Sequence, residues 1–338
     1  MKIKKSLITQ IIDHYVLDES RNNKYLPKSG DVAMFEILEI GKHKTMQSDS
    51  KRNVSIFVGD KILAVFGDRY ATEQFEGYVP TEIQSEYHIL GAGGVIGILH
   101  SKNEAYKDIE PTKVRLIGYA VDESNNIINT KFFKINAPQF NPSNKGPKVI
   151  LSLGATMDSG KTTTAAYISR GLYLGNKKVG FIKLTGTAYT KDKDFIFDAG
   201  AMIAMDFSDA GYPSTFTVPV TEILQIYEYL KTKICEENDL DCIVMEIADG
   251  ILQQETYQLI SNKAFMSTIS EVVFSCGDSL SAIQGMTLFS NLEINPLFLC
   301  GKFTMSELLI KEVQKHLEIP IFTLSQLESK MANSLLNA

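Results

Sequence analysis

Residues 154–163, with the sequence GATMDSGKTT, decide the fold of this chain. They lie between an apolar run, KVILSL (148–153), and a stretch typical of a helix, KTTTAAYISRGLYLG (161–175). In a phosphate-binding loop, successive backbone N–H groups and the N-terminus of the following helix face the phosphate oxygens. A glycine-rich loop between a strand and a helix therefore predicts a nucleotide-phosphate site.

Each polar residue of this loop has a candidate role. Gly160 permits close approach of the backbone, Lys161 reaches the β- and γ-phosphates, and the Thr162 hydroxyl binds Mg²⁺. Asp158 either orients a nucleophile or caps the loop. The predicted nucleotide-binding residues are Gly154, Thr156, Asp158, Ser159, Gly160, Lys161, Thr162 and Thr163.

Length and charge limit the possible functions. The chain has 338 residues, which favours two domains over one. Residues 1–148 carry 20 Lys and Arg against 18 Asp and Glu, a net charge of +2, whereas residues 149–338 carry 14 against 22, a net charge of −8. The acidic second half argues against broad nucleic-acid binding. No apolar run approaches the ~18 residues of a membrane span.

The N-terminal segment and the cysteines favour a cytoplasmic protein. Residues 1–20 begin with basic side chains, but their apolar stretch is short and no small-residue cleavage site follows. We therefore expect an amphipathic helix within residues 1–30. The four cysteines form no CxxC pair, which predicts buried, reduced thiols. The five histidines show no zinc-site spacing.

The region from 31 to 135 is typical of an all-β domain. Short runs rich in β-branched and aromatic residues alternate with Gly, Asp, Asn and Pro, which predicts a small β-barrel or sandwich. The predicted strands are 32–40, 53–59, 61–67, 94–100, 113–121 and 127–135. Residues 136–147 contain three prolines and no periodic pattern, so we interpret them as a linker.

One glycine-rich stretch in this region, GAGGVIG (91–97), invites comparison with dinucleotide-binding loops. It does not fit GxGxxG, because Ile96 holds the last position, and a strand rather than a helix follows. Glycines at a tight corner or bulge explain the stretch more simply.

From 148 to 338 the predicted strands alternate with helices. Such alternation predicts an α/β domain with a mostly parallel sheet and helices on both faces. The predicted strands are 148–153, 177–184, 241–248, 271–276, 295–300 and 319–324, and the predicted helices are 161–175, 221–238 and 305–318.

The loop is one residue longer than GxxxxGK[ST], since Gly154 and Gly160 are separated by five residues. This spacing resembles GTxxxxGKT in dethiobiotin synthetase and the cobyrinic acid amide synthases. Those enzymes belong to the SIMIBI class of P-loop NTPases, which also holds the signal-recognition and nitrogenase-iron-protein NTPases. The resemblance covers about 149–325 and leaves the first 148 residues without a counterpart.

Two further strand ends carry the resemblance. Lys183 in VGFIKLTGT matches the family lysine that contacts phosphate and the activated substrate. Glu246 in VMEIADG matches the acidic residue near Mg²⁺, and Gly250 matches the last glycine of that motif. Ile247 and Asp249 stand where the family has glycines, which leaves the substrate open.

Other carboxylates have two possible roles. The class carries Mg²⁺ or substrate ligands between the second strand and the next helix, where Asp206 and Asp209 flank a short turn. We expect Asp209 to join Thr162 and Glu246 as a metal ligand, although turn and cap formation would equally explain it. Asp249, three residues after Glu246, is either a general base or a turn residue.

These features together predict an enzyme that uses Mg²⁺ and ATP to phosphorylate or activate a small molecule. The predicted catalytic residues are Lys161, Lys183 and Asp249. ATP is favoured over GTP because no NKxD guanine motif follows a strand.

Two alternative functions stay open, an NTPase switch or assembly factor acting on a protein partner, and a polynucleotide 5′-kinase. One kinase family of the class also places a β domain before its P-loop domain. Dimers are common in the class, so the resemblance implies a homodimer.

Overall fold

The strand that precedes the glycine-rich loop lies inside a fully parallel sheet. The computed structural model describes residues 3–132, 138–143, 145–236 and 238–329. Six strands follow the order β13-β12-β14-β11-β15-β16, and every neighbouring pair is parallel. Their bounds are β11 Lys148–Gly154, β12 Val179–Lys183, β13 Ile203–Asp206, β14 Cys242–Glu246, β15 Glu271–Ser275 and β16 Phe298–Cys300.

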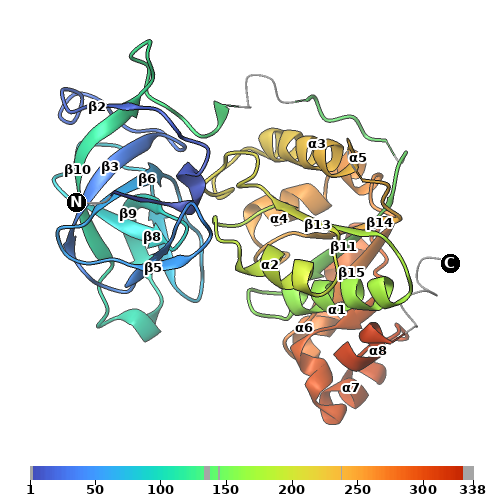
Figure 1. Ribbon diagram of the computed structural model, residues 1–338. Coiled ribbons are helices and arrows are strands. Elements are labelled where there is room, and N and C mark those ends of the chain that lie inside the picture. The colour runs from blue at the N-terminus through green and yellow to red at the C-terminus, as the bar shows by residue number, and fades with distance from the viewer. Residues whose placement is uncertain (1–2, 133–137, 144, 237, 330–338) are drawn as a thin grey trace. The chain divides into compact units, whose positions relative to one another are not determined.

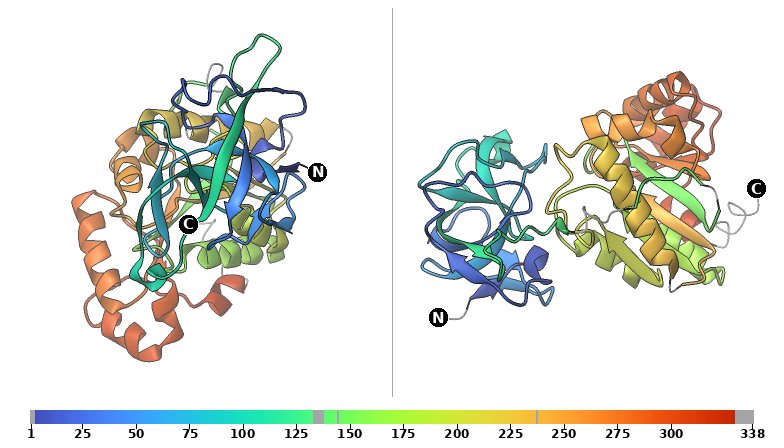
Figure 2. Two further views of the ribbon diagram at one scale, coloured as in Figure 1. Left: turned by 90° about the vertical axis from the view of Figure 1, so that its left-hand side faces the viewer. Right: turned by 90° about the horizontal axis from the view of Figure 1, so that it is seen from above.

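Helices cover both faces of this sheet (Figure 1). Because strand side chains alternate between faces, Val179 and Phe181 pack with Ala165 of α1, whereas Gly180 faces Ile234 of α3. Figure 2 looks down on the α3 face in its right-hand view. The helices are α1 Lys161–Leu174, α2 Lys191–Asp198, α3 Val220–Glu236, α4 Gln254–Ile260, α5 Lys263–Met266, α6 Ser279–Asn291, α7 Glu307–Gln314 and α8 Leu324–Glu328. The predicted α/β domain is confirmed.

The N-terminal region forms a closed barrel. Strands β6, β3, β10, β8 and β9 are neighbours in this order, and β6 also pairs with β9, which closes the ring. Phe35, Phe66, Tyr87 and Tyr119 fill its core. The strands are β1 Lys4–Lys5, β2 Val16–Asp18, β3 Val32–Glu39, β4 Thr45–Gln47, β5 Asn53–Ser55, β6 Lys61–Phe66, β7 Phe75–Tyr78, β8 Tyr87–Gly91, β9 Val95–Lys102 and β10 Thr112–Val121. The predicted small β-barrel is therefore confirmed.

Ala92, Gly93 and Gly94 join β8 to β9, as the interpretation of GAGGVIG as a tight corner requires. Gly94 has a φ of +94°, in the left-handed region that favours glycine. No helix follows this turn, so the stretch offers no helix N-terminus to a dinucleotide.

The predicted amphipathic helix within residues 1–30 is wrong. Lys4 and Lys5 pair with β6 as a short parallel strand, and only a 3₁₀ turn, Leu7–Thr9, follows before β2. Leu7 and Ile8 are buried in the barrel region. The apolar side chains of this segment are spaced nearly as in a helix, but the backbone that carries them is extended or forms a turn. Tertiary contacts with the barrel override the weak local preference for a helix.

Two predicted strands are shorter or absent. Residues 127–132 form isolated bridges through Ile127 and Asn129, and 133–135 lie outside the described residues. Residues 319–324 form one bridge, between Ile321 and Leu299. The predicted linker 136–147 has no helix or strand in its described part, and residues 136, 137 and 144 lie outside it.

The chain divides into two units that do not follow a single boundary in sequence. The barrel unit contains Met1–Ala137 together with Gly186–Thr190 and Phe207–Thr217, and the P-loop unit contains the rest. We call 186–190 and 207–217 the first and second shared segments, because the P-loop sequence supplies them to the barrel unit.

All four cysteines are free, and three of them are buried. No helix among the described residues has the length and apolar character that crossing a membrane requires.

Candidate nucleotide site

Unusual backbone angles shape the glycine-rich loop between β11 and α1. Gly160, at the start of α1, has a φ of +105°, and Asp158 has a φ of +59°. A Cβ on Gly250 would lie 2.5 Å from the Ala155 carbonyl oxygen, and one on Gly301 would lie 2.5 Å from the Ser159 carbonyl oxygen. The two glycines therefore allow neighbouring strand ends to approach the loop backbone closely.

Lys161 is a buried cation at the start of α1. Its side chain is 6% exposed, and Nζ donates a hydrogen bond to the Thr156 carbonyl oxygen at 3.3 Å. Burial lowers the pKa of Lys161, while Glu246 and Asp249 oppose that shift. Because burying a cation costs free energy, an anion placed beside Nζ would stabilise this arrangement.

Thr162 and Glu246 bring two oxygen ligands together beneath the loop. The Thr162 hydroxyl donates to Glu246 Oε1 at 2.9 Å, and among the described residues Glu246 Oε2 accepts no hydrogen bond. Glu246 is 1% exposed, and burial raises its pKa against the influence of Lys183 and Lys161. A buried carboxylate oxygen without a hydrogen bond is costly unless a ligand binds it.

This pair fits a magnesium ion held jointly by protein and nucleotide. No three His, Cys, Asp or Glu side chains gather as a metal site within the described part of the chain. Mg²⁺, however, is commonly bound by one or two carboxylates together with substrate phosphates and water. Thr162 and Glu246 would supply the protein ligands of such an ion.

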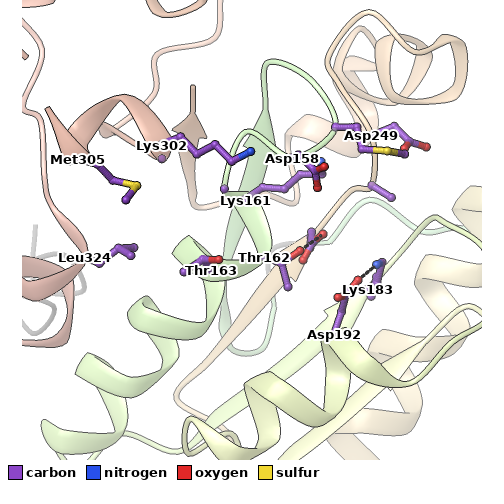
Figure 3. A pocket seen from close by; sticks show the side chains of 15 residues that line it. Asp158, Lys161, Thr162, Thr163, Lys183, Asp192, Asp249, Lys302, Met305 and Leu324 are labelled. Carbon is purple, nitrogen blue, oxygen red and sulfur yellow. Dashed lines mark hydrogen bonds and ion pairs between the residues drawn. The ribbon is translucent and has the colours of Figure 1, made fainter. Parts of the chain in front are cut away.

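Lys183 lies at the end of β12, beside Glu246 on the adjacent strand β14. It forms an ion pair with Asp192 in the first turn of α2 (Figure 3). Burial works to lower the pKa of Lys183, but Glu246 and Asp192 outweigh it, so the pKa lies above its usual value. Lys183 therefore stays charged and lines the pocket together with its partner Asp192.

A pocket of 470 Å³ lies over these residues, within the usual range for small-molecule sites. Of the predicted site residues, Asp158, Gly160, Lys161, Thr162, Thr163, Lys183, Glu246 and Asp249 line it. Gly154, Thr156 and Ser159 do not line it: Gly154 and Ser159 are buried, whereas Thr156 is exposed. Ser159 is buried, and a Cβ on Gly154 would lie 2.4 Å from its hydroxyl oxygen.

Asp209, the third predicted metal ligand, is not among the residues that line the pocket. It belongs to the second shared segment, which groups with the barrel unit. Its neighbour Asp206 ends β13 and forms a buried ion pair with Lys193 at 3.2 Å.

Sequence reasoning missed several residues that line the pocket. Gly301 and Lys302 follow β16, and the carboxyl end of a parallel strand is the expected place for ligand contacts. Met305 and Leu324 supply apolar side chains at the same end of the pocket (Figure 3). Asp192 gave a weaker signal, as one of several aspartates in a polar stretch.

The fold and the site define a P-loop nucleotide-binding domain of the α/β type. A parallel sheet, a glycine-rich loop after a strand, and a buried lysine at the start of the next helix are its features. No protein-family model and no curated protein sequence matches this chain.

Several solved structures are similar to it at low identity. Chloroplast FtsY from Physcomitrella patens is 17% identical, with 62% of this chain and 71% of that chain covered and a TM-score of 0.38. Hydrogenase maturation factor HypB from Archaeoglobus fulgidus is 13% identical, with 62% and 94% covered and a TM-score of 0.38. A ParA family ATPase from Chlorobium tepidum TLS is 13% identical, with 58% and 98% covered and a TM-score of 0.33. At these scores the likeness carries no argument about function.

Proposed function

We propose that this protein is an Mg²⁺- and ATP-dependent enzyme that transfers the γ-phosphate to a small molecule, or activates that molecule with it. The observation that carries the proposal is the group of buried Lys161, buried Glu246 and half-buried Lys183 around one pocket. Buried Lys161 would be stabilised by an anion, and the buried Glu246 Oε2 atom, which accepts no hydrogen bond among the described residues, would be stabilised by a cation. A metal–nucleotide complex supplies both.

The residues of the chain divide the work of phosphoryl transfer. Lys161 and Lys183 stabilise the negative charge that spreads over the transferred group, and the loop N–H groups hold the phosphates. Mg²⁺, held by Thr162 and Glu246, would neutralise phosphate charge.

Asp249 lines the same pocket, with a φ of +62° in the left-handed region. Its carboxylate would accept the proton of an attacking hydroxyl or amine. Because Asp249 is a second carboxylate in this pocket, it favours a small molecule rather than water as the acceptor of the phosphate.

The first test is ATP binding and phosphate release by the purified protein, with Lys161→Ala as the variant and Lys113→Ala as the control. Lys113 forms an exposed ion pair with Glu39 in the barrel. We expect Mg²⁺-dependent ATP binding, little phosphate release without an acceptor, and loss of binding only in Lys161→Ala. Failure of the wild-type protein to bind ATP would overturn the proposal.

A second candidate function is an NTPase switch that acts on a protein partner. The two shared segments favour it, because each follows a strand of the P-loop unit in sequence and yet belongs to the barrel unit, which suits them to transmit a change. Rapid phosphate release by the protein alone, abolished in Lys161→Ala, would select this function over transfer to a small molecule.

A further inference from the structure

The first shared segment, 186–190, connects two residues of the nucleotide site. Lys183 ends β12 immediately before it, and Asp192, the partner of Lys183, follows it in α2. On the Lys183 side the chain is fixed to the P-loop unit by Thr185, whose hydroxyl accepts the Ala248 N–H at 2.8 Å. The segment is thus a short loop that follows Lys183 and precedes Asp192 in sequence and that belongs as a whole to the barrel unit.

A buried glutamine of the barrel holds the end of this segment that leads to Asp192. Gln47, at the end of β4 and 3% exposed, donates to the Thr190 hydroxyl at 2.6 Å and accepts the Thr190 N–H at 3.0 Å. One residue, Lys191, separates Thr190 from Asp192. Since one residue spans at most about 3.6 Å, the chain has little slack, and a shift of Thr190 passes to Asp192.

The middle of the first shared segment is packed tightly within the barrel unit. The Ala188 N–H donates to the Pro213 carbonyl oxygen at 3.0 Å, which joins the two shared segments. A Cβ on Gly93 would lie 2.0 Å from the Ala188 carbonyl oxygen. The absence of a side chain at Gly93 therefore allows the barrel backbone to contact the segment directly, so the segment moves with the barrel.

The second shared segment, 207–217, reaches the same helix by another route. It begins directly after Asp206, which is ion-paired with Lys193 in the first turn of α2. Gly211 lies so close to the barrel that a Cβ there would be 1.8 Å from the Thr130 carbonyl oxygen. The start of α2, which carries Asp192, is therefore linked to both segments that the barrel unit holds.

We propose that the barrel unit controls nucleotide affinity through the two shared segments, with Gln47 as the residue that positions Asp192 against Lys183. This inference rests on the proposed function, because it requires a phosphate group that competes with Asp192 for Lys183. A carboxylate held beside Lys183 repels phosphate and occupies the lysine. Any change that moves Thr190 shifts the balance between these two partners of Lys183.

A double-mutant cycle on the full-length protein tests this coupling, with the affinity for Mg²⁺–ATPγS as the readout. We expect Gln47→Ala to tighten binding by roughly three- to thirtyfold, since it frees the start of α2. In an Asp192→Asn background the same substitution should change affinity less than twofold, because the competing charge is already absent. Lys113→Ala, elsewhere in the barrel, serves as the control with unchanged affinity.

A matched pair at Thr190 covers the case in which Gln47→Ala does not fold. Thr190→Val removes the hydroxyl that accepts from Gln47, and Thr190→Ser keeps it. We expect the valine variant to tighten binding in the way described for Gln47→Ala, and the serine variant to match the wild type. The coupling would be overturned if Gln47→Ala changed the affinity equally in the wild-type and Asp192→Asn backgrounds. It would also be overturned if Thr190→Val and Thr190→Ser bound Mg²⁺–ATPγS with the same affinity.

Hydrogen exchange separates this inference from the proposed function. Saturating Mg²⁺–ATPγS should change exchange in residues 45–55 and 207–217 of the wild type but not of Lys161→Ala. Tight binding without any change in these segments would refute the coupling and leave the nucleotide site intact. No binding at all would overturn both.

Discussion

Two buried carboxylates, one in each unit, show how a structural acid differs from a candidate functional one. Asp31 in the barrel accepts the Lys28 N–H at 2.7 Å, the Tyr25 hydroxyl at 2.8 Å and the Asn129 amide at 2.9 Å. Glu246 in the P-loop unit accepts one hydrogen bond, from Thr162, and its other oxygen accepts none within the described residues. Burial raises the pKa of both.

The difference teaches that burial alone does not identify a site. Asp31 uses its hydrogen-bonding capacity to fix the turn before β3, so no ligand is needed to offset its burial. Glu246 lies beside two lysines, and within the described part of the chain its second oxygen accepts no hydrogen bond, so a bound ligand would offset its burial. The three substitutions below test whether this distinction holds, beginning with the largest expected effect.

Asp31→Ala should destabilise the barrel strongly and leave nucleotide binding unchanged. The substitution removes the acceptor of three donors, and unsatisfied donors at such a site cost about 3 kcal/mol of unfolding free energy. Chemical denaturation measures the loss, with Asp31→Asn, which keeps one acceptor oxygen, as the milder control. Weaker ATP binding in a folded Asp31→Ala protein would break the comparison.

Glu246→Gln should have the opposite profile. Loss of a charged metal ligand should weaken Mg²⁺-dependent ATP affinity by roughly tenfold to a hundredfold, since a hydrogen bond or ligand contact to a charged group contributes about 1.5–3 kcal/mol. Thermal unfolding should change little, because the substitution removes two opposing contributions. These are the cost of burying the Glu246 charge and the attraction of that charge to Lys161 and Lys183. A magnesium titration at fixed ATP measures the effect. Unaltered magnesium dependence would show that Glu246 is structural.

The smallest expected effect is a pH dependence of the unfolding free energy, which arises from His43 in the barrel. Burial, aided by Arg69 and Lys42, lowers the pKa of His43 to about 3, against about 6.5 in the unfolded chain. Between these values the unfolded state binds the extra proton, so the stability contributed by neutral His43 is lost as pH falls from about 6.5 toward 3. The slope is at most about 1.4 kcal/mol per pH unit.

Unfolding curves of the wild type and His43→Leu across that range measure this term as a difference of slopes. The wild type should lose stability faster on acidification. Parallel pH dependences would mean that His43 is not held neutral by the fold, and would remove the second example of a structural buried group in the barrel.

Eight of the residues that line the pocket were predicted from the sequence, because the determinants of the candidate site are local or lie at strand ends. The glycines and Lys161 are contiguous, and Lys183 and Glu246 each end an apolar strand. Parallel strands place their carboxyl ends at one edge, so these residues meet without any further information. Lys302 could have been found by the same argument applied to the end of β16.

The role of Asp209 and the structure of the first thirty residues could not be predicted in this way. The apolar residues of the N-terminus satisfy a helical spacing, yet Lys4 and Lys5 pair with β6, more than fifty residues away. Asp209 follows a strand of the P-loop unit, but its segment groups with the barrel unit. Neither long-range pairing leaves a periodic signal in the local sequence.

The sequence by itself therefore determined the phosphate loop, the alternation of strands and helices around it, and the barrel-forming character of the first region. These follow from local backbone preferences and from apolar patterns of period 2 and 3.6. Only the tertiary structure decided that residues 186–190 and 207–217 belong with the barrel and that Gln47 holds Thr190. Such contacts join residues more than eighty positions apart, and they depend on the close packing of specific atoms rather than on any repeating pattern.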